Sequence, residues 1–167
     1  MNEEVPPFPA VLEPGPRQQA LDLLRTYAGE YTELSRRSAQ ALTLHVTDVN
    51  ALVEVLWAER LGEPLSPVRL AERVGLTSGA TNALINRLED AGYVARSREH
   101  ADRRQVTLRA TALARSRTAD FYTRPAAVLE KAFDTLEPQT LSALIGALDV
   151  LTCALHDINQ ELRPAPH

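Results

Sequence analysis

The fold of this 167-residue chain is decided by residues 65–111, which read LSPVRLAERVGLTSGATNALINRLEDAGYVARSREHADRRQVTLRAT. Ser66 followed by proline is a strong helix start, because a capping hydroxyl precedes the residue best suited to the first helical position. This helix is short and stops at Gly75, and Thr77 caps a second helix over about 78–91. Two short helices joined by a tight turn that contains glycine are typical of a helix-turn-helix.

A period-two pattern follows the second helix. Residues 93–96 and 105–110 alternate, and Val106, Leu108 and Ala110 share one face. The opposite face takes Gln105, Thr107 and Arg109. The polar loop between the two runs, SREHADRR, is too long for a two-residue turn. The pattern therefore predicts a β-hairpin "wing" beside the helix-turn-helix.

Helices are expected on the N-terminal side of this segment. Residues 17–44 place apolar side chains at three- and four-residue spacing with no proline, which predicts one long helix. A second helix is expected to run to about Leu61, with Thr47 as its N-cap. Its predicted apolar stripe consists of Val49, Leu52, Val53, Leu56 and Trp57.

Two further helices are expected on the C-terminal side. Thr111 caps the first, which runs to about Thr135 and should kink at Pro125. Pro138 starts the second. Its predicted near-heptad seam over five turns consists of Leu141, Leu144, Leu148, Leu151, Leu155 and Ile158. Helices this long have more apolar length than a small domain can cover, which implies a partner helix.

The predicted fold class is therefore mainly α with a small β-hairpin, a winged helix-turn-helix with long helices at both ends. The expected domains are a proline-rich extended or disordered arm at 1–16, a dimerisation helix at 17–44, a DNA-binding winged helix-turn-helix at 45–111 and dimerisation helices at 112–161.

The charge is distributed unevenly. The whole chain has a formal net charge of −4, which by itself argues against a nucleic-acid binder. Residues 66–117, however, contain ten arginines and five acids, a net of +5, whereas the remainder has a net of −9. Anion binding is local, so a basic segment inside an acidic protein still indicates a surface for nucleic acid.

Several function classes find no support in the sequence. The single cysteine, Cys153, excludes an intramolecular disulfide and a cysteine-based zinc knuckle, and the four histidines have no metal-ligand spacing. No nucleophile–base arrangement, glycine-rich phosphate loop or catalytic carboxylate pair stands out, so no enzyme, metal or cofactor is expected. Acidic residues at the N-terminus and the lack of an apolar run of about 20 residues predict a soluble cytoplasmic protein without a membrane partner.

The second helix of the pair carries the candidate base-reading residues. Ser78, Asn82 and Asn86 are expected opposite its apolar face, and Asn82 is the best candidate because an amide can bond adenine bidentately. Thr77, with the N–H groups of the helix start, and Arg87 suit backbone phosphates. The alternative is that these polar side chains form an ordinary solvated surface.

The predicted wing carries Arg98, Arg103 and Arg104. A hairpin tipped with arginine can enter a narrow minor groove, whose negative potential is enhanced. The alternative is a solvated charged turn.

The run from Leu70 to Thr111 resembles the MarR family of winged helix-turn-helix transcription regulators. The matching pieces are Leu70-Ala71-Glu72-Arg73 before Gly75, Arg87-Leu88-Glu89 before Gly92, and Asp102-Arg103-Arg104 at the wing. The resemblance covers roughly residues 45–145. It implies an obligate homodimer with interleaved N- and C-terminal helices and two wings on one DNA duplex.

The sequence departs from the family pattern in places. Asn86 stands where the family often has an aspartate that can pair with the wing arginine, so the partner that orients the wing is missing. Thr81 occupies a usually apolar slot. Ala110-Thr111 replaces Leu-Thr, and Leu113-Ala114 replaces Lys-Gly.

The resemblance also implies a small anionic or aromatic effector bound between the dimer helices and the DNA-binding lobe. By position, Tyr31, His45 and Trp57 are the candidates to line such a crevice. The interpretation preferred here is that Trp57 belongs to the core and His45 is a hydrogen-bonded helix-end residue. For Cys153, a buried inert thiol is preferred to an oxidant sensor.

The predicted function is a homodimeric, sequence-specific DNA-binding regulator, a repressor released by a small ligand. Two-fold symmetry predicts a pseudo-palindromic operator with half-sites about 10 bp apart. The alternative is a winged-helix module that binds protein rather than DNA.

Overall fold

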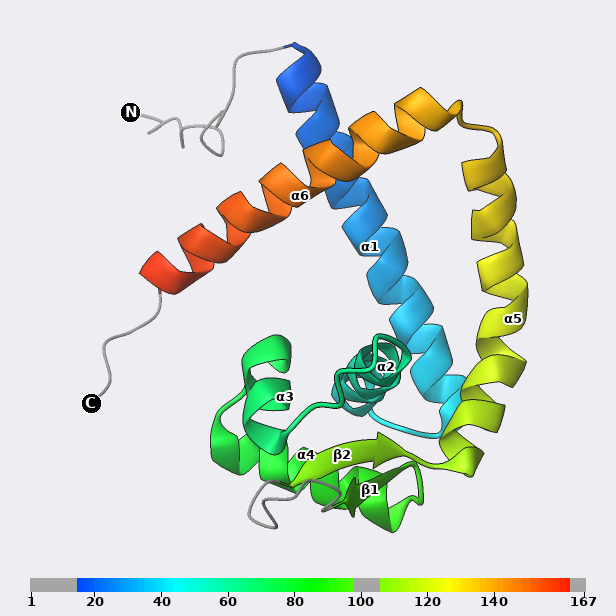
Figure 1. Cartoon of the computed structure of the whole chain (residues 1–167), viewed down its shortest axis with the longest axis vertical. Coiled ribbons are helices and arrows are strands. Elements are labelled where there is room, and N and C mark those ends of the chain that lie inside the picture. Colours follow the sequence, from blue (N-terminus) through cyan, green and yellow to red (C-terminus); the bar gives the residue numbers. More distant parts are fainter. Residues whose placement is uncertain (1–14, 98–105, 163–167) are drawn as a thin grey trace, which may run out of the picture. The chain divides into compact units, whose positions relative to one another are not determined.

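The computed structural model describes residues 15–97 and 106–162 and divides the chain into two compact units, Met1–Phe121 and Tyr122–His167. The helices and strands, labelled in Figure 1, are α1 (Pro16–Leu42), α2 (Val46–Arg60), α3 (Pro67–Val74), α4 (Ser78–Asp90), β1 (Val94–Ser97), β2 (Thr107–Ala110), α5 (Ala112–Asp134) and α6 (Pro138–Glu161). The element order is that of a winged helix-turn-helix with added helices, as predicted. Residues 1–14 of the predicted arm lie outside the described residues.

The helix-turn-helix forms where its caps predict. The Ser66 hydroxyl accepts a hydrogen bond from the Arg69 N–H at 3.3 Å, and the Thr77 hydroxyl accepts one from the Ala80 N–H at the same distance. Between the two helices, Gly75 has a φ of 67°, a left-handed conformation that side chains with a Cβ rarely adopt. The cap hydroxyls and this glycine therefore set the turn between α3 and α4.

The start of α2 differs from the prediction. Thr47 does not cap this helix, because α2 already begins at Val46 and His45 occupies the N-cap position without a side-chain hydrogen bond. The αL residue at the end of α1 is Thr43, with a φ of 58°, so the connection is only three residues long. The second helix therefore begins one residue before the predicted capping hydroxyl of Thr47.

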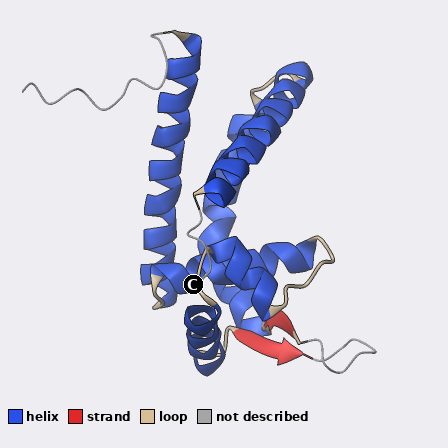
Figure 2. Ribbon diagram, turned by 90° about the vertical axis from the view of Figure 1, so that its left-hand side faces the viewer, coloured by secondary structure: helices blue, strands red, loops and turns tan. Residues whose placement is uncertain are grey.

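The two strands pair in antiparallel fashion, as Figure 2 shows in red. Val94 lies opposite Ala110, and Ser97 lies opposite Thr107. The predicted alternation is only partly confirmed: Leu108 and Ala110 are buried, but so is Thr107 on the opposite face. Both faces of β2 are partly covered, and the Leu108 N–H also donates to the Leu65 carbonyl at 2.8 Å.

The core of the first unit lies between α2 and the helix-turn-helix. Fully buried side chains come from α2, from the loop before α3, from α3, from α4 and from β2; among them are Val49, Leu52, Val55, Leu65, Leu70, Leu84, Ile85, Leu88 and Leu108. Burying one such side chain stabilises a fold by about 1.5–3 kcal/mol. These contacts orient α4 so that one face is buried and the other is left exposed.

Part of the predicted apolar stripe of α2 lies outside this core. Trp57 is 53% exposed, with the Arg60 guanidinium 5.5 Å from the ring centroid, so its assignment to the core is wrong. Val55 and Ala58 are buried instead. The stripe is displaced because α2 is covered by α1, α3, α4 and β2, which meet more than one of its faces.

The second unit contains the rest of α5 and the whole of α6. None of the α6 residues is buried, and Leu144, Leu148, Leu151, Leu155 and Ile158 of the predicted seam are exposed. By length and composition alone, α6 is the one helix of the described chain long and apolar enough to span a membrane. This corrects the expectation that no segment approaches that length, although one such helix is weak evidence for a membrane. Pro125 lies inside α5, and the kink expected there stays a prediction.

The Thr81 side chain generates a stability prediction. Its hydroxyl is buried, and it has no hydrogen-bond partner among the described residues. We expect Thr81→Val to stabilise the protein by about 1 kcal/mol, because the substitution removes an unsatisfied polar group at almost constant volume. Urea unfolding followed by circular dichroism measures the difference.

Thr118→Val is the matched control. Its hydroxyl is also buried but donates to the Ala114 carbonyl at 2.6 Å, so this substitution should not stabilise the protein. Equal effects of the two substitutions would contradict the assignment of Thr81 as unsatisfied.

Candidate nucleic-acid interface

The outer face of α4 carries the predicted base-reading residues. Ser78, Asn82 and Asn86 are exposed and follow one another at four-residue spacing, which aligns them along one side of a helix. Leu84, Ile85 and Leu88 on the inner side are buried. The structure thus brings the three predicted residues into one exposed polar stripe on α4, whose opposite side packs against the core.

The N-terminus of α4 is organised by Thr77, the fourth predicted contact residue. Its hydroxyl is occupied as an acceptor by the Ala80 N–H, but it retains its own proton for donation. A helix N-terminus presents free N–H groups and a positive dipole end, an arrangement that favours anions such as phosphate.

Arg87 has a different placement from the one expected. Its Nε donates to Asp48 Oδ2 at 3.0 Å and its Nη2 to Asp48 Oδ1 at 2.5 Å, a bidentate ion pair. Hydrogen bonding to Asp48 raises the pKa of Arg87 further above its ordinary value. The guanidinium binds a protein carboxylate, so its first role is to hold α4 against α2.

Asp48 is a residue that sequence reasoning missed. It is 1% exposed, so its carboxylate has exchanged water for the Arg87 guanidinium. It precedes Arg87 by 39 positions, and no local pattern links the two. The available signal for a buried carboxylate was the position of Asp48 in the first turn of α2, next to Val49 of the predicted apolar stripe.

The base of the wing is tied to α4 by Arg96. This residue forms an ion pair with Glu89, and its backbone N–H donates to Glu89 Oε1 at 3.1 Å. Its Nη2 also donates to Asn86 Oδ1 at 2.9 Å. The expectation that Asn86 leaves the wing without a partner is therefore corrected, because Glu89 supplies the anion one helical turn later. Arg98, Arg103 and Arg104 lie outside the described residues.

A second carboxylate anchors the other strand. Glu59 of α2 accepts from the Ala110 N–H at 3.2 Å and pairs with Arg115 at 2.9 Å. Arg109 is 3.8 Å from the same carboxylate. Because Glu59 joins α2, β2 and the first turn of α5, it fixes the hairpin relative to the core.

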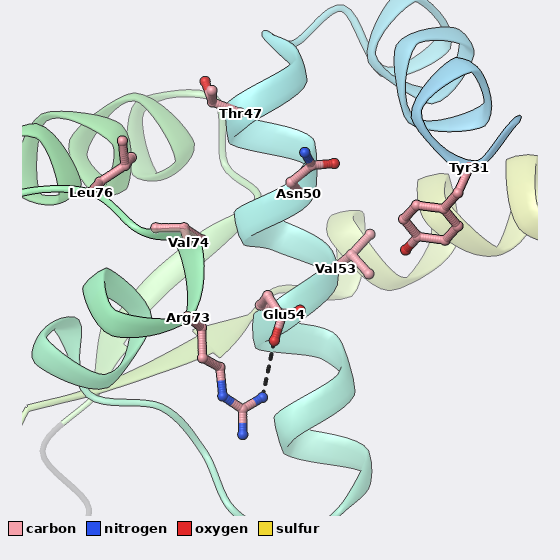
Figure 3. A pocket seen from close by; sticks show the side chains of 8 residues that line it. All are labelled: Tyr31, Thr47, Asn50, Val53, Glu54, Arg73, Val74 and Leu76. Atoms are coloured by element: carbon pink, nitrogen blue, oxygen red, sulfur yellow. Dashed lines mark hydrogen bonds and ion pairs between the residues drawn. The ribbon is translucent and has the colours of Figure 1, made fainter. Parts of the chain in front are cut away.

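The three candidate effector residues are not brought together. Tyr31 lines a cavity of about 310 Å³ with Asn50, Val53, Glu54 and Arg73, shown in Figure 3. His45 lines a different hollow with Arg36, Gln40 and Arg87, and Trp57 lines neither.

The cavity of Tyr31 has mixed chemistry. Glu54 and Arg73 form an ion pair of 3.0 Å across its wall, and Val74 and Leu76 add apolar surface. Asn50 and Glu54 were not predicted; the signal for them was their four-residue spacing on the polar side of α2.

Cys153 and the possible metal ligands can also be placed. Cys153 is an exposed free thiol within the described chain, which corrects the preferred buried placement. In residues 15–97 and 106–162, no group of three His, Cys, Asp or Glu side chains is arranged to hold a metal ion.

The Asp48–Arg87 pair generates a prediction. Asp48→Asn should destabilise the protein by about 1–3 kcal/mol, because it weakens two charge-assisted hydrogen bonds in a buried place. Arg87→Ala should lower the urea midpoint further, because it leaves the buried carboxylate without a counter-charge.

A double variant separates the two contributions. If the pair acts as described, Asp48→Asn combined with Arg87→Ala should be more stable than Arg87→Ala alone. Additive losses would show that the two residues do not interact.

Comparisons with known proteins agree with this geometry. Residues 56–106 match the model of the MarR family. A relative from Bacillus subtilis, the uncharacterized HTH-type transcriptional regulator YcgE, is 36% identical over 91 residues, which cover 53% of this chain and 55% of the relative. The chain thus aligns with about half the length of the curated relatives it matches.

Solved structures share the fold over most of their length. A MarR protein from Peptoclostridium difficile superposes with a TM-score of 0.64 at 15% identity, covering 91% of this chain and 97% of the other. A point mutant of MepR from S. aureus, solved bound to an oligodeoxyribonucleotide, gives a TM-score of 0.53 at 14% identity, covering 81% and 97%. With the shared element order and the winged hairpin, these findings show that residues 56–106 match the MarR family and that the chain has the fold of MarR-family structures.

Proposed function

We propose that this chain is a sequence-specific, double-stranded DNA-binding transcriptional regulator that acts as a homodimer. The observation that carries the proposal is the exposed stripe of Ser78, Asn82 and Asn86 on α4. A helix fits the major groove of B-DNA, and amide and hydroxyl side chains can reach base edges there. The chain acts by binding, and no catalytic role is proposed.

The surroundings of this stripe support the proposal. Asp48 holds α4 from behind through Arg87, and Arg96 ties the wing to the same helix. A recognition helix held at two places keeps its register relative to the wing, so that both can meet DNA together. The MepR mutant bound to an oligodeoxyribonucleotide has the same fold.

In this proposal, the phosphates are bound mainly by the wing and by the start of α4. Arg98, Arg103 and Arg104 enter the minor groove, and Thr77 with the first N–H groups of α4 meets the backbone. Arg87 can add a phosphate contact through guanidinium N–H groups that do not face Asp48. The alternative of a protein-binding module predicts no such dependence on phosphate.

Dimerisation is supported by the exposed apolar residues of the long helices. Those of α6 lie at near-heptad spacing and have no cover within the second unit. An exposed apolar surface of this extent marks an interface. We propose that 17–44 and 112–161 form the dimer, which places two helix-turn-helix segments on a pseudo-palindromic operator.

Regulation by a small ligand completes the proposal. The cavity lined by Tyr31, Asn50, Glu54 and Arg73 offers an aromatic edge, an amide and a charged pair. An anionic or aromatic effector bound there would meet α1, α2 and α3 together and could release a repressor from its operator. The proposed location of the protein is the cytoplasm.

The wing generates a prediction about salt dependence. An Arg103→Ala, Arg104→Ala double variant should bind all DNA sequences more weakly, and the slope of log K against log [salt] should become shallower by about four units, two for each wing of the dimer. Fluorescence anisotropy with a selected operator between about 50 and 200 mM salt measures both quantities.

Arg17→Ala combined with Arg25→Ala removes the same charge from exposed positions of α1, and it is the matched control once sedimentation velocity shows that this variant is still a dimer. Normal operator binding by the wing variant would refute the wing assignment. Binding without any salt dependence in the wild type would favour the protein-binding alternative.

The dimer generates a separate prediction. Sedimentation velocity at micromolar concentration should show a dimer, and Leu148→Glu with Leu151→Glu should convert it to a monomer by placing charges in the seam. Val150→Glu adds a charge to the same helix outside the seam and should leave the dimer intact. A folded wild-type monomer at this concentration would refute the dimer.

A further inference from the structure

We propose that Asn86 is held as a hydrogen-bond donor and reads guanine in the major groove, whereas Asn82 keeps the freedom to read adenine. The inference rests on the proposed DNA binding and deepens it, since it states which base each of two amides selects. Its starting point is the contact between Asn86 and Arg96 at the base of the wing.

The orientation of the Asn86 amide follows from the chemistry of its partner. A guanidinium has only donors, so the Asn86 atom that faces it must be the carbonyl oxygen. Arg96 Nη2 lies 2.9 Å from Asn86 Oδ1. A flipped amide would oppose two N–H donors at this distance, which is repulsive. The Nδ2 group of Asn86 is therefore the part that remains available for DNA.

Glu89 prevents Arg96 from releasing this oxygen easily. The carboxylate pairs with the Arg96 guanidinium and also accepts the backbone N–H of the same residue at 3.1 Å. Arg96 is thus fixed at its backbone and at its side chain, and the side chains of Arg96 and Glu89 are 34% and 27% exposed. Charge-assisted hydrogen bonds in such surroundings are stronger than neutral ones. Arg96 therefore stays on the wing side of Asn86.

The hydrogen-bonding group of Asn86 that remains free determines which base this residue can bind. Bidentate binding of adenine needs an amide oxygen for N6 and an amide N–H for N7. Asn86 would have to turn its oxygen away from Arg96 to meet this need. Guanine instead offers two acceptors, N7 and O6, and no donor on its major-groove edge. A held donor such as Nδ2 of Asn86 therefore fits guanine, where it can meet both acceptors, better than adenine, where the N6 donor lies beside N7, or thymine, which offers one acceptor, O4, beside its methyl group.

Asn82 provides an internal comparison for Asn86, because it carries the same amide on the same helix. It lies one turn earlier on the same exposed stripe, and its side chain makes no hydrogen bond to the described residues. Its amide can rotate to present both an acceptor and a donor, the pattern that adenine requires. Two asparagines on one helix would then select different bases because only one is held by the wing.

Selection of bound duplexes from a random pool tests the proposal. The wild-type protein should select guanine at one position of each half-site, and Asn86→Ala should reduce that preference on the order of 5- to 10-fold, the effect of losing one contact to a base edge. Asn82→Ala should reduce an adenine preference at a different position. Circular dichroism checks that both exposed-site variants are folded.

Glu89→Gln tests the holding of the amide, with Asp90→Asn as the neighbouring control of equal charge change. Glu89→Gln should weaken the guanine preference and admit adenine at the same position, because Arg96 then releases Asn86 more readily. Asp90→Asn should leave this position as in the wild type. A merely structural role of Glu89 would lower binding to all sequences without changing the selected base.

Three outcomes would overturn the inference. Adenine selected by the wild type and lost in Asn86→Ala would show that the amide is not held as a donor. Selection of an operator that Asn86→Ala leaves unchanged would remove Asn86 from base reading while the proposed DNA binding stands. No selection of any sequence by the wild type would refute both the proposed function and this inference.

Discussion

The ion pair between buried Asp48 and the partly exposed Arg87 is the interaction on which the arrangement of this protein depends. A carboxylate with 1% exposure needs a counter-charge, and the Arg87 guanidinium meets it with two hydrogen bonds. Apolar packing of Leu84 and Leu88 is non-directional and tolerates some rotation of α4, whereas a bidentate pair does not. The pair therefore helps decide which residues of α4 face outward, and the polar stripe is the result.

Acidic residues of α2 neutralise part of the positive charge of the basic segment, residues 66–117. Three acids of this helix, Asp48, Glu54 and Glu59, lie outside residues 66–117 in sequence but pair with arginines inside them. Glu89, which lies within the segment, forms an ion pair with Arg96. Of the seven arginines of this segment that the structure describes, five contact carboxylates: Arg73, Arg87, Arg96, Arg109 and Arg115. Much of the apparent positive charge thus holds the domain together, and the proposed DNA surface depends more heavily on the wing.

The sequence predicted the parts of the fold that depend on neighbouring residues. The caps at Ser66 and Thr77 and the stop at Gly75 are local, and each is confirmed. The predictions that failed concern contacts between distant segments. Trp57 has the spacing of a core residue but lies at the surface, because α2 is packed on several faces and its stripe is displaced. For the candidate site, the stripe on α4 was predictable from helical spacing, but the pairing of Arg87 and Arg96 was not.

The sequence by itself determined the order of helices and strands, the helix-turn-helix, the hairpin and the polar face of α4, because each follows from periodicity and capping over a few residues. Only the tertiary structure decided which charged groups meet. Asp48 and Arg87 are 39 positions apart, and Glu59 reaches Arg115 across 56. Such pairs form because folding brings distant segments together and buries the carboxylates, and a buried carboxylate needs a counter-charge that no local sequence pattern identifies.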